Sequence, residues 1–405
     1  MLDLRPHVRP GDGVWWGQAA AEATPLVDAL HEQFADIGDV RAFCGISPHR
    51  RTPPDGLTVV SYGAMGQLRS LRERLEVVPA HYSTLPRLFA QRLLPGDVGL
   101  VQVAPPGPDG TCSLGIGVDY SADAARYSRT LVAEVNHRMP VTRGEPGIPL
   151  DRFAAVLETD RPLPALSDRA PDDVDAAIAA HVADLVEDGD TIQIGVGALP
   201  NAILAGLAGH RDLGVHTGMI TDGVLRLVEA GVVTGSRKEI DPGVVMTGMA
   251  LCSPGLYASL PGLPVEFRPA GYTHGAAVLA RLGRLVSVNA ALQIDLTGQV
   301  GSETVAGRYL GGVGGQADFS GAAARTGARS IIALRSCAGE SSTVVTALDG
   351  PVTTARADVD VVVTEHGVAH LRGCPLPDRP RRLAAIADPR HRDALLRAAS
   401  PKGLR

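Results

Sequence analysis

The sequence predicts an α/β protein built from two related domains, and three observations support this fold class. Short apolar runs alternate with longer segments of helical period, which is typical of strands and helices around largely parallel sheets. The chain has 405 residues, more than a single hydrophobic core usually serves. The strand, glycine turn and helix that open the first half recur in the second half.

The predicted strands are rich in β-branched residues, and the predicted helices have apolar residues at helical spacing. In chain order, we expect strands at Val14–Trp16, Thr58–Ser61, Val98–Val103, Thr130–Val135, Thr191–Gly195, Leu285–Asn289, Ser330–Leu334 and Asp360–Val363. We expect helices at Pro25–Gln33, Gly66–Leu75, Asp173–Glu187, Pro200–Leu207 and Arg381–Ser400. Pro25 and Pro200 suit a first helical turn.

Three pairs of segments indicate an internal duplication. "RPGDGVWWGQAAAEATPLVDAL" at 9–30 resembles "EDGDTIQIGVGALPNAILAGL" at 187–207, and "LVQVAPPGPDGTCSLG" resembles "LVSVNAALQIDLTGQVGSE". "GVDYSADAARYSRTLVAEV" resembles "GQADFSGAAARTGARSIIAL", so that Asp119 matches Asp318. Chance explains any one pair of Ala/Gly-rich segments, but three pairs in the same order favour duplication. With the Pro-rich stretch 158–177 as linker, we expect domains at 1–170 and 171–405 and a ligand cleft between them.

Composition excludes several classes of function. The 38 basic residues are outnumbered by 44 acidic ones and aromatic residues are only 4%, which argues against a nucleic-acid partner. We find no signal peptide and no apolar run long enough for a membrane span, so we expect a cytoplasmic protein without a membrane partner. The five cysteines are widely spaced without a Cys-x-x-Cys pair, so we expect neither disulfides nor a bound metal.

Two glycine-rich loops are the first candidate ligand sites. Gly195-Val196-Gly197-Ala198-Leu199 follows a strand and opens a helix, so its backbone N–H groups suit a phosphate, although a tight turn alone also explains the glycines. "GGVGGQADF" at 311–319 includes Gly314 and Gly315, and its backbone donors suit an oxyanion. A surface turn is the alternative reading.

Five motifs in order resemble the acetyl-CoA hydrolase/transferase family: "GVGALPNAIL", "LGVHTGMITDGVLRLVEAGVV", "LVSVNAALQIDLTGQVGSETV", "GVGGQADF" and "VVVTEHGVAHLRG". The resemblance implies two NagB/RpiA-like domains of CoA-transferase type, with acyl-CoA bound between them, and a homodimer. It implies that Gly195 to Leu199 line the coenzyme A site together with Leu292, Gly314 and Gly315. Acyl-CoA and a small-molecule acceptor are the partners it implies.

The sequence departs from the family at its catalytic residue. The family's transferases use a glutamate in a His-Ser/Thr-Glu-Met motif, which attacks the thioester and becomes a glutamyl-CoA. The matching segment here is His216-Thr217-Gly218-Met219, so Gly218 stands at the glutamate position. Removing that side chain would open space for an alcohol, amine or water to attack directly, giving acyl transfer or hydrolysis.

Two other interpretations remain open. Another carboxylate, from Glu303, Glu266 or Asp222, would preserve CoA transfer if it reached the vacant position. Alternatively, the protein binds acyl-CoA without turning it over.

The direct route needs a base, and His216 is the first candidate because it is two residues from Gly218. His274 in "GYTHGAA" is a second candidate, although ordinary loop polarity explains it equally well. Cys337 could act as a nucleophile, but it has no evident partner base. Asp318 is better suited to anchoring its glycine loop than to transferring a proton. Trp15 and Trp16 are expected to point to opposite faces of a strand, one toward the core and the other lining the cleft.

Overall fold

The computed structural model describes residues 1–49, 51–165 and 170–399, and the chain divides into two compact units. The first unit comprises Met1–Leu166, Gly218–Asp222 and Met246–Gly275. The second comprises Ser167–Thr217, Gly223–Val245 and Ala276–Arg405. Two segments of the second half of the chain therefore belong to the first unit, and residues 166–169 of the predicted linker lie outside the described residues. The division into domains 1–170 and 171–405 stays a prediction.

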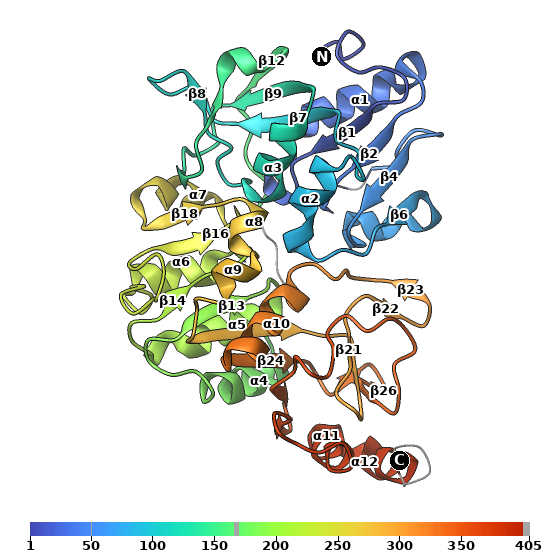
Figure 1. Cartoon of the computed structure of the whole chain (residues 1–405), viewed down its shortest axis with the longest axis vertical. Coiled ribbons are helices and arrows are strands. Elements are labelled where there is room, and N and C mark those ends of the chain that lie inside the picture. Colours follow the sequence, from blue (N-terminus) through green and yellow to red (C-terminus); the bar gives the residue numbers. More distant parts are fainter. Residues whose placement is uncertain (50, 166–169, 400–405) are drawn as a thin grey trace. The chain divides into compact units, whose positions relative to one another are not determined.

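The first unit is built on a seven-stranded parallel sheet of order β12-β9-β7-β1-β2-β4-β6 (Figure 1). Its strands are β1 (Gly13–Trp16), β2 (Arg41–Phe43), β4 (Thr58–Ser61), β6 (Leu75–Val77), β7 (Val98–Val103), β9 (Thr130–Asn136) and β12 (Ala155–Thr159). Its main helices are α1 (Thr24–Ile37), α2 (Leu85–Ala90) and α3 (Asp119–Tyr127). Both β1 and β7 are buried along their whole length, as expected for central parallel strands.

The second unit is built on a six-stranded sheet of order β14-β13-β19-β24-β28-β29. Its strands are β13 (Thr191–Ile194), β14 (Gly214–Val215), β19 (Leu285–Ala290), β24 (Arg329–Ala333), β28 (Val361–Thr364) and β29 (Gly367–His370). Its helices include α4 (Asp173–Ala183), α5 (Ala198–Gly206), α9 (Ala276–Leu279), α10 (Gln316–Thr326), α11 (Arg379–Ile386) and α12 (Pro389–Ala398). All pairs in this sheet are parallel except the β28–β29 hairpin.

The two sheets repeat one strand order. The run β2-β1-β7-β9-β12 in the first unit corresponds to β14-β13-β19-β24-β28 in the second. The segment pairs found in the sequence fall on β1 and β13, on β7 and β19, and on α3–β9 and α10–β24. The shared order supports the duplication inferred from the sequence and agrees with the predicted α/β fold.

Short strands attach the returning segments to the first unit. β15 (Met219–Ile220) pairs with β17 (Met249–Ala250), and β18 (Val265–Phe267) lies between β10 (Arg143–Gly144) and β16 (Val245–Thr247). The Gly218 carbonyl accepts hydrogen bonds from the backbone N–H groups of Gly248 and Met249, both at 3.1 Å. Gly248 in turn accepts from the N–H groups of Val118 and Asp119 at 3.1 and 3.0 Å. Backbone pairing thus fixes Gly218 beside the start of α3.

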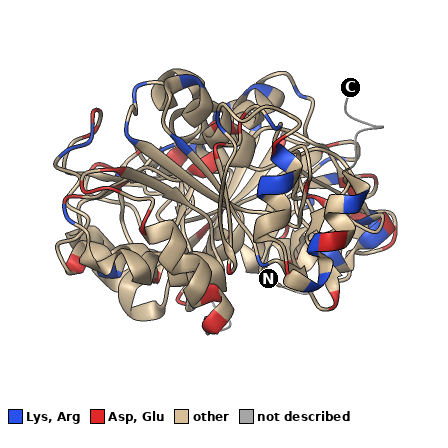
Figure 2. Cartoon of the chain, turned by 90° about the horizontal axis from the view of Figure 1, so that it is seen from below, with Lys and Arg blue, Asp and Glu red and all other residues tan. Residues whose placement is uncertain are grey.

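The remaining elements are short. Their bounds are β3 (Ile46–Ser47), β5 (Met65–Gly66), β8 (Thr111–Cys112), β11 (Ile148–Pro149), β20 (Gln293–Asp295), β21 (Val300–Gly301), β22 (Thr304–Val305), β23 (Arg308–Tyr309), β25 (Cys337–Ala338), β26 (Ser341–Ser342), β27 (Val344–Val345), α6 (Asp222–Glu229), α7 (Pro254–Ser259) and α8 (Ala270–Thr273). Charged residues of both signs are mixed along the helices and loops, and the strands carry few of them (Figure 2). No described helix combines the length and apolar character that crossing a bilayer requires.

Two helix predictions were wrong. The segment Gly66–Leu75 forms two 3-10 turns, Gln67–Ser70 and Arg72–Arg74, before β6 begins at Leu75. Positive φ angles at Gly66 (58°) and Arg72 (50°) prevent a continuous α-helix there. The predicted helix from Arg381 is two helices, because Asp388 and Pro389 start a new one and the Asp388 side chain accepts from the Arg390 N–H. Ser400 lies outside the described residues.

Candidate functional site

Gly218 lies against the ring of His274 in the first unit. A Cβ atom built on Gly218 would stand 2.8 Å from His274 Cε1 and 2.9 Å from Nε2. Real Cβ contacts are longer than this, so no side chain fits at position 218 while the ring stays where it is. The expectation of open space beside Gly218 is therefore wrong within this unit, because an imidazole fills the place where a side chain would begin.

His274 is buried, with 4% of its surface exposed, at the C-terminal end of α8. Its backbone N–H donates to the Ala270 carbonyl at 3.0 Å. Its Nδ1 lies 2.8 Å from Thr273 Oγ1, and its ring packs on the Tyr82 ring with centroids 4.6 Å apart and planes tilted by 46°. Helix geometry, the contact with Thr273 Oγ1 and the packing on Tyr82 all contribute to fixing the imidazole.

Gln18 connects Tyr82 to further buried polar groups of the first unit. Gln18 Nε2 donates to Tyr82 Oη at 2.6 Å and to Asp119 Oδ2 at 2.9 Å, while Gln18 Oε1 accepts from Tyr62 Oη at 2.8 Å. Burial raises the pKa of the Asp119 carboxyl above its ordinary value, and the hydrogen bond from Gln18 opposes this shift. Burial also raises the pKa of both tyrosines well above the ordinary value. We call Gln18, Tyr62, Tyr82 and Asp119 the Gln18 network.

His216 belongs to the second unit, directly after β14. Its side chain is fully buried and its backbone N–H donates to the Ile192 carbonyl at 3.1 Å. The next residue, Thr217, donates its hydroxyl to the Ile194 carbonyl at 3.0 Å. These bonds hold the His-Thr segment against β13.

The predicted glycine turn at 195–199 forms the junction between β13 and α5. Gly197 has a φ of 121°, a conformation that L side chains rarely adopt, and a Cβ at Gly195 would meet nothing within 4 Å. Val196 is 40% exposed. Ala198 and Leu199 form the first turn of α5, where backbone N–H groups have no partner within the helix. The turn combines open space with backbone donors, as an anionic ligand requires.

Leu292 and the loop 311–315 lie at the same edge of the second sheet. Leu292 follows β19, the neighbour of β13, and donates its backbone N–H to the Gly301 carbonyl at 3.0 Å. Gly315 precedes α10, and Gly314 has a φ of 51° with open space around it. Asp318 lies in the first turn of α10. The predicted coenzyme A residues of this unit therefore gather where β13 and β19 end.

The three alternative carboxylates have partners of their own. Glu303 is 3% exposed and accepts hydrogen bonds from Tyr309 Oη at 2.6 Å and Thr353 Oγ1 at 3.0 Å. Glu266 pairs with Arg268 at 3.0 Å, and Asp222 accepts from the Ser253 N–H at 2.7 Å. These contacts correspond to structural roles.

Cys337 is unsuited to nucleophilic attack. Burial and the Asp388 carboxylate, 3.5 Å from the sulfur, raise the pKa of the Cys337 thiol. The thiolate, which is the reactive form, is thereby disfavoured. Among the described residues no cluster of His, Cys, Asp and Glu has the arrangement of a metal site.

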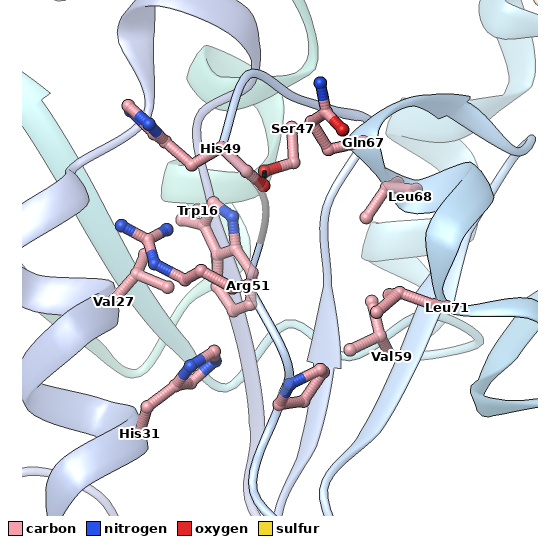
Figure 3. A pocket seen from close by; sticks show the side chains of 11 residues that line it. Trp16, Val27, His31, Ser47, His49, Arg51, Val59, Gln67, Leu68 and Leu71 are labelled. Atoms are coloured by element: carbon pink, nitrogen blue, oxygen red, sulfur yellow. Dashed lines mark hydrogen bonds between the residues drawn. The ribbon is translucent and has the colours of Figure 1, made fainter.

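A separate pocket of about 350 Å³, part of it open to solvent, lies in the first unit between α1 and the loop after β3. Figure 3 shows Ser47, His49 and Gln67 at one end, His31 at the other and Arg51 between them. Arg51 bridges Glu22 at 2.5 Å and Asp28 at 2.8 Å. Trp16 lines this pocket, whereas the preceding Trp15 packs on Phe89 and Tyr120. Arg51, the one arginine among the described residues that line the pocket, is thus neutralised by two carboxylates.

The fold and the glycine turns define a protein of the CoA-transferase type. The acetyl-CoA hydrolase/transferase N-terminal domain matches residues 65–166 and the C-terminal domain of the same name matches residues 256–399. The chain is 40% identical over 329 residues to the 4-hydroxybutyrate coenzyme A transferase of Clostridium kluyveri, covering 80% of this chain and 77% of the relative. The chain belongs to the acetyl-CoA hydrolase/transferase family.

Solved structures agree with this assignment. The crystal structure of RipA from Yersinia pestis is 33% identical, with a TM-score of 0.91 over 99% of this chain and 96% of that one. The 4-hydroxybutyrate CoA-transferase of Porphyromonas gingivalis is 34% identical, with a TM-score of 0.82 over 98% and 96% of the two chains. The relatives include CoA transferases and an acetyl-CoA hydrolase, so the family assignment supports an acyl-CoA transferase or thioester hydrolase.

Proposed function

We propose that this protein transfers an acyl group directly from a CoA thioester to a small acceptor or to water, without a glutamyl-CoA intermediate. The observation that carries the proposal is the His274 ring at 2.8–2.9 Å from the position of a Gly218 Cβ. Position 218 cannot hold a carboxylate in this arrangement. The nearby ring can instead bind a proton or donate one.

The proposal assigns coenzyme A binding to Gly195, Val196, Gly197, Ala198, Leu199, Leu292, Gly314 and Gly315. The first turn of α5 supplies backbone donors for phosphate, and the open loop at 314–315 allows close approach of the ligand to the backbone. His216, the base candidate argued from its spacing to Gly218, and Gly218, which stands at the family's glutamate position, stay predictions as catalytic positions. A cytoplasmic location and a homodimer stay predictions.

In the reaction, an acceptor hydroxyl, amine or water attacks the thioester carbonyl carbon and forms a new C–O or C–N bond. Donors around the carbonyl stabilise the oxyanion of the tetrahedral intermediate. The C–S bond then breaks, and the proton lost by the acceptor ends on the departing sulfur. The products are free coenzyme A and an ester, amide or carboxylic acid.

Ordinary CoA transfer through a different carboxylate is the second candidate. Two of the alternative carboxylates already have partners, which argues against this candidate. Glu303 accepts hydrogen bonds from Tyr309 and Thr353, and Glu266 pairs with Arg268. A non-catalytic acyl-CoA-binding protein is the third.

Incubation of the purified protein with acetyl-CoA labelled in the acetyl group separates the three. We expect release of coenzyme A thiol, labelled acetate or a labelled acceptor ester, and no borohydride-sensitive protein–CoA adduct by intact-protein mass spectrometry. An adduct together with conversion of added butyrate to butyryl-CoA would overturn the proposal in favour of CoA transfer. Binding of acetyl-CoA without any product would overturn it in favour of the binding protein.

A further inference from the structure

A groove in the first unit combines an apolar lining with an arginine that has no acidic partner. We propose that this groove binds a short- or medium-chain carboxylate, an acid with an unbranched alkyl chain. The residues that line it all lie between Leu114 and Arg152, so the groove belongs to the first unit alone. It is separate from the pocket beside α1 and from the glycine turn that follows β13, and its ligand is independent of the proposed acyl transfer.

The lining of the groove suits an alkyl chain. Its walls come from α3, the start of β9 and the segment around β11, and its volume is about 400 Å³ with part of it open to solvent. The apolar residues that line it include Leu114, Ala122, Ala125, Leu131, Ile148 and Pro149. A cleft of this size with a mainly apolar lining and a few polar groups is typical of small-molecule sites. An alkyl chain that lies in it removes apolar surface from water.

The charges of the groove favour an anion. Three charged residues line it, Arg126, Glu145 and Arg152. Arg126 pairs with Glu145, whose side chain is 11% exposed, and also lies 3.4 Å from Asp123. Arg152 has no carboxylate within ion-pair distance in the part of the chain that the structure describes. The lining therefore carries one uncompensated positive charge, which a monocarboxylate would neutralise.

The guanidinium of Arg152 is held at the end of α3. Its Nη2 donates a hydrogen bond of 2.6 Å to the carbonyl oxygen of Ser128, the residue that follows α3. Ser128 Oγ in turn accepts from Trp15 Nε1 at 2.7 Å. A guanidinium has five N–H groups in one plane, and a carboxylate in a bidentate pair takes two of them. The bond to Ser128 therefore positions the side chain and leaves donors for a carboxylate.

One wall of the groove has a rigid backbone. The segment 145–149 reads Glu-Pro-Gly-Ile-Pro, and each proline fixes its own φ angle. Ile148 and Pro149 of β11 pair with Cys112 and Thr111 of β8. A preformed wall lowers the ordering cost that a ligand must overcome on binding.

The primary test titrates the full chain with hexanoate in a calorimeter. Hexanoate should bind, and affinity should rise about two- to fourfold with each added methylene from butyrate to octanoate, because each CH₂ buries further apolar surface. Hexylamine has the same chain and the opposite charge, so it should bind at least about tenfold more weakly beside Arg152. The absence of hexanoate binding would overturn the proposal, and so would equal binding of hexanoate and hexylamine.

Two variants test whether the ligand lies in the groove. Arg152→Gln removes the charge and should weaken hexanoate binding about tenfold or more, because a charge-assisted pair is lost. Ala125→Leu fills the groove from α3 and should weaken hexanoate binding by a similar factor. Arg87→Gln is the matched control, because Arg87 is an exposed arginine of the same unit that lies on α2 outside the groove. Circular dichroism checks that each variant is folded. Unchanged hexanoate binding in both folded groove variants would overturn the proposal.

A crystal soaked with ω-bromohexanoate gives a direct readout that needs no variant. The anomalous signal of the bromine should lie in the groove, with the carboxylate against the guanidinium of Arg152. A bromine found only at other places on the protein would overturn the proposal. Failure of the proposed acyl transfer is a different result, because it appears as a CoA adduct or as absence of turnover and leaves hexanoate binding unchanged.

Discussion

The turn after β1 and the turn after β13 occupy equivalent places in the two sheets, yet they are built differently. In the first unit the turn carries Gln18 and Glu22, which are 1% and 0% exposed and bind neighbouring side chains. In the second unit the turn is Gly195-Val196-Gly197, with open space at Gly195 and an exposed Val196. One turn is filled by its own polar side chains, and the other leaves its backbone accessible.

This difference suggests that the equivalent turns of a duplicated fold have taken different roles, one in stability and the other in ligand binding. The side chains of the first turn stabilise the unit and support His274, whereas the backbone of the second turn suits a phosphate of the ligand. Substitutions in the first turn should therefore lower stability or kcat, and substitutions in the second should lower the affinity for acyl-CoA.

The largest effect should come from removing the cation that pairs with Glu22. Arg51→Ala leaves a fully buried carboxylate with Ser47 Oγ as a remaining partner at 2.9 Å. We expect the free energy of unfolding to fall by about 3–5 kcal/mol, because a broken buried ion pair leaves an uncompensated charge. Urea unfolding checks this value. Arg41→Ala, which removes an exposed pair with Glu76, should change stability by less than about 1 kcal/mol. Equal losses in the two variants would show that Glu22 is not a buried structural charge.

A second prediction restores the family's carboxylate. Gly218→Glu alone should overpack against His274 and lower the free energy of unfolding by about 1–3 kcal/mol, without forming a CoA adduct. The double variant Gly218→Glu, His274→Ala should recover that stability. It should also form a borohydride-sensitive glutamyl-CoA and transfer coenzyme A from acetyl-CoA to butyrate, giving butyryl-CoA and acetate, at least about 100-fold faster than the unmodified protein. Mass spectrometry of the intact protein detects the adduct, and the rate of butyryl-CoA formation measures the transfer. An adduct in the single variant with unchanged stability would mean that the ring does not block position 218.

The third prediction concerns acid stability of the first unit, where two groups act in opposite directions. Burial raises the pKa of Asp123 to about 6, so its neutral form favours folding and this contribution is lost as pH rises from about 4 through 6. Burial, reinforced by the Arg51 charge, lowers the pKa of His31 to about 4. The folded state therefore binds fewer protons at His31 than the unfolded state does, and the free energy of unfolding rises as pH rises over the same interval.

Single substitutions should separate the two contributions to the pH dependence of the free energy of unfolding. His31→Gln should become less stable by about 2 kcal/mol as pH rises from 4 to 6, and Asp123→Asn should become more stable by a similar amount. In the unmodified protein the two contributions largely offset each other. Urea unfolding at pH 4, 5 and 6 tests this, and parallel curves for all three proteins would contradict it.

The sequence predicts the interior of the fold better than its edges, and the reason is burial. Val98–Val103 and Thr58–Ser61 are found where expected, because strands in a parallel sheet are continuous apolar runs. The edge strand β12 was not predicted, because none of its residues is fully buried and it therefore lacks a continuous apolar run. Pairing with β9 holds it in the sheet.

The candidate site shows the same division. The glycine turns are local features and are visible in the sequence. The contact of Gly218 with His274 is made by two segments distant in the chain, which the β15–β17 pairing and α8 bring together. No local pattern around His274 distinguishes it from a loop histidine, so only tertiary structure identifies it.

The smallest predicted effect concerns the second turn and separates strain from ligand binding. Gly197→Val forces a β-branched residue to a φ of 121°, and Gly231→Val does the same at 72° on an exposed helix end of the same unit. Each should lower the free energy of unfolding by about 1–2 kcal/mol. Only Gly197→Val should weaken acetyl-CoA binding, by about tenfold in calorimetry, because it alone places a side chain in the turn assigned to coenzyme A. If Gly231→Val weakens binding equally, backbone strain rather than a lost ligand contact explains the effect, and the second turn has no special function.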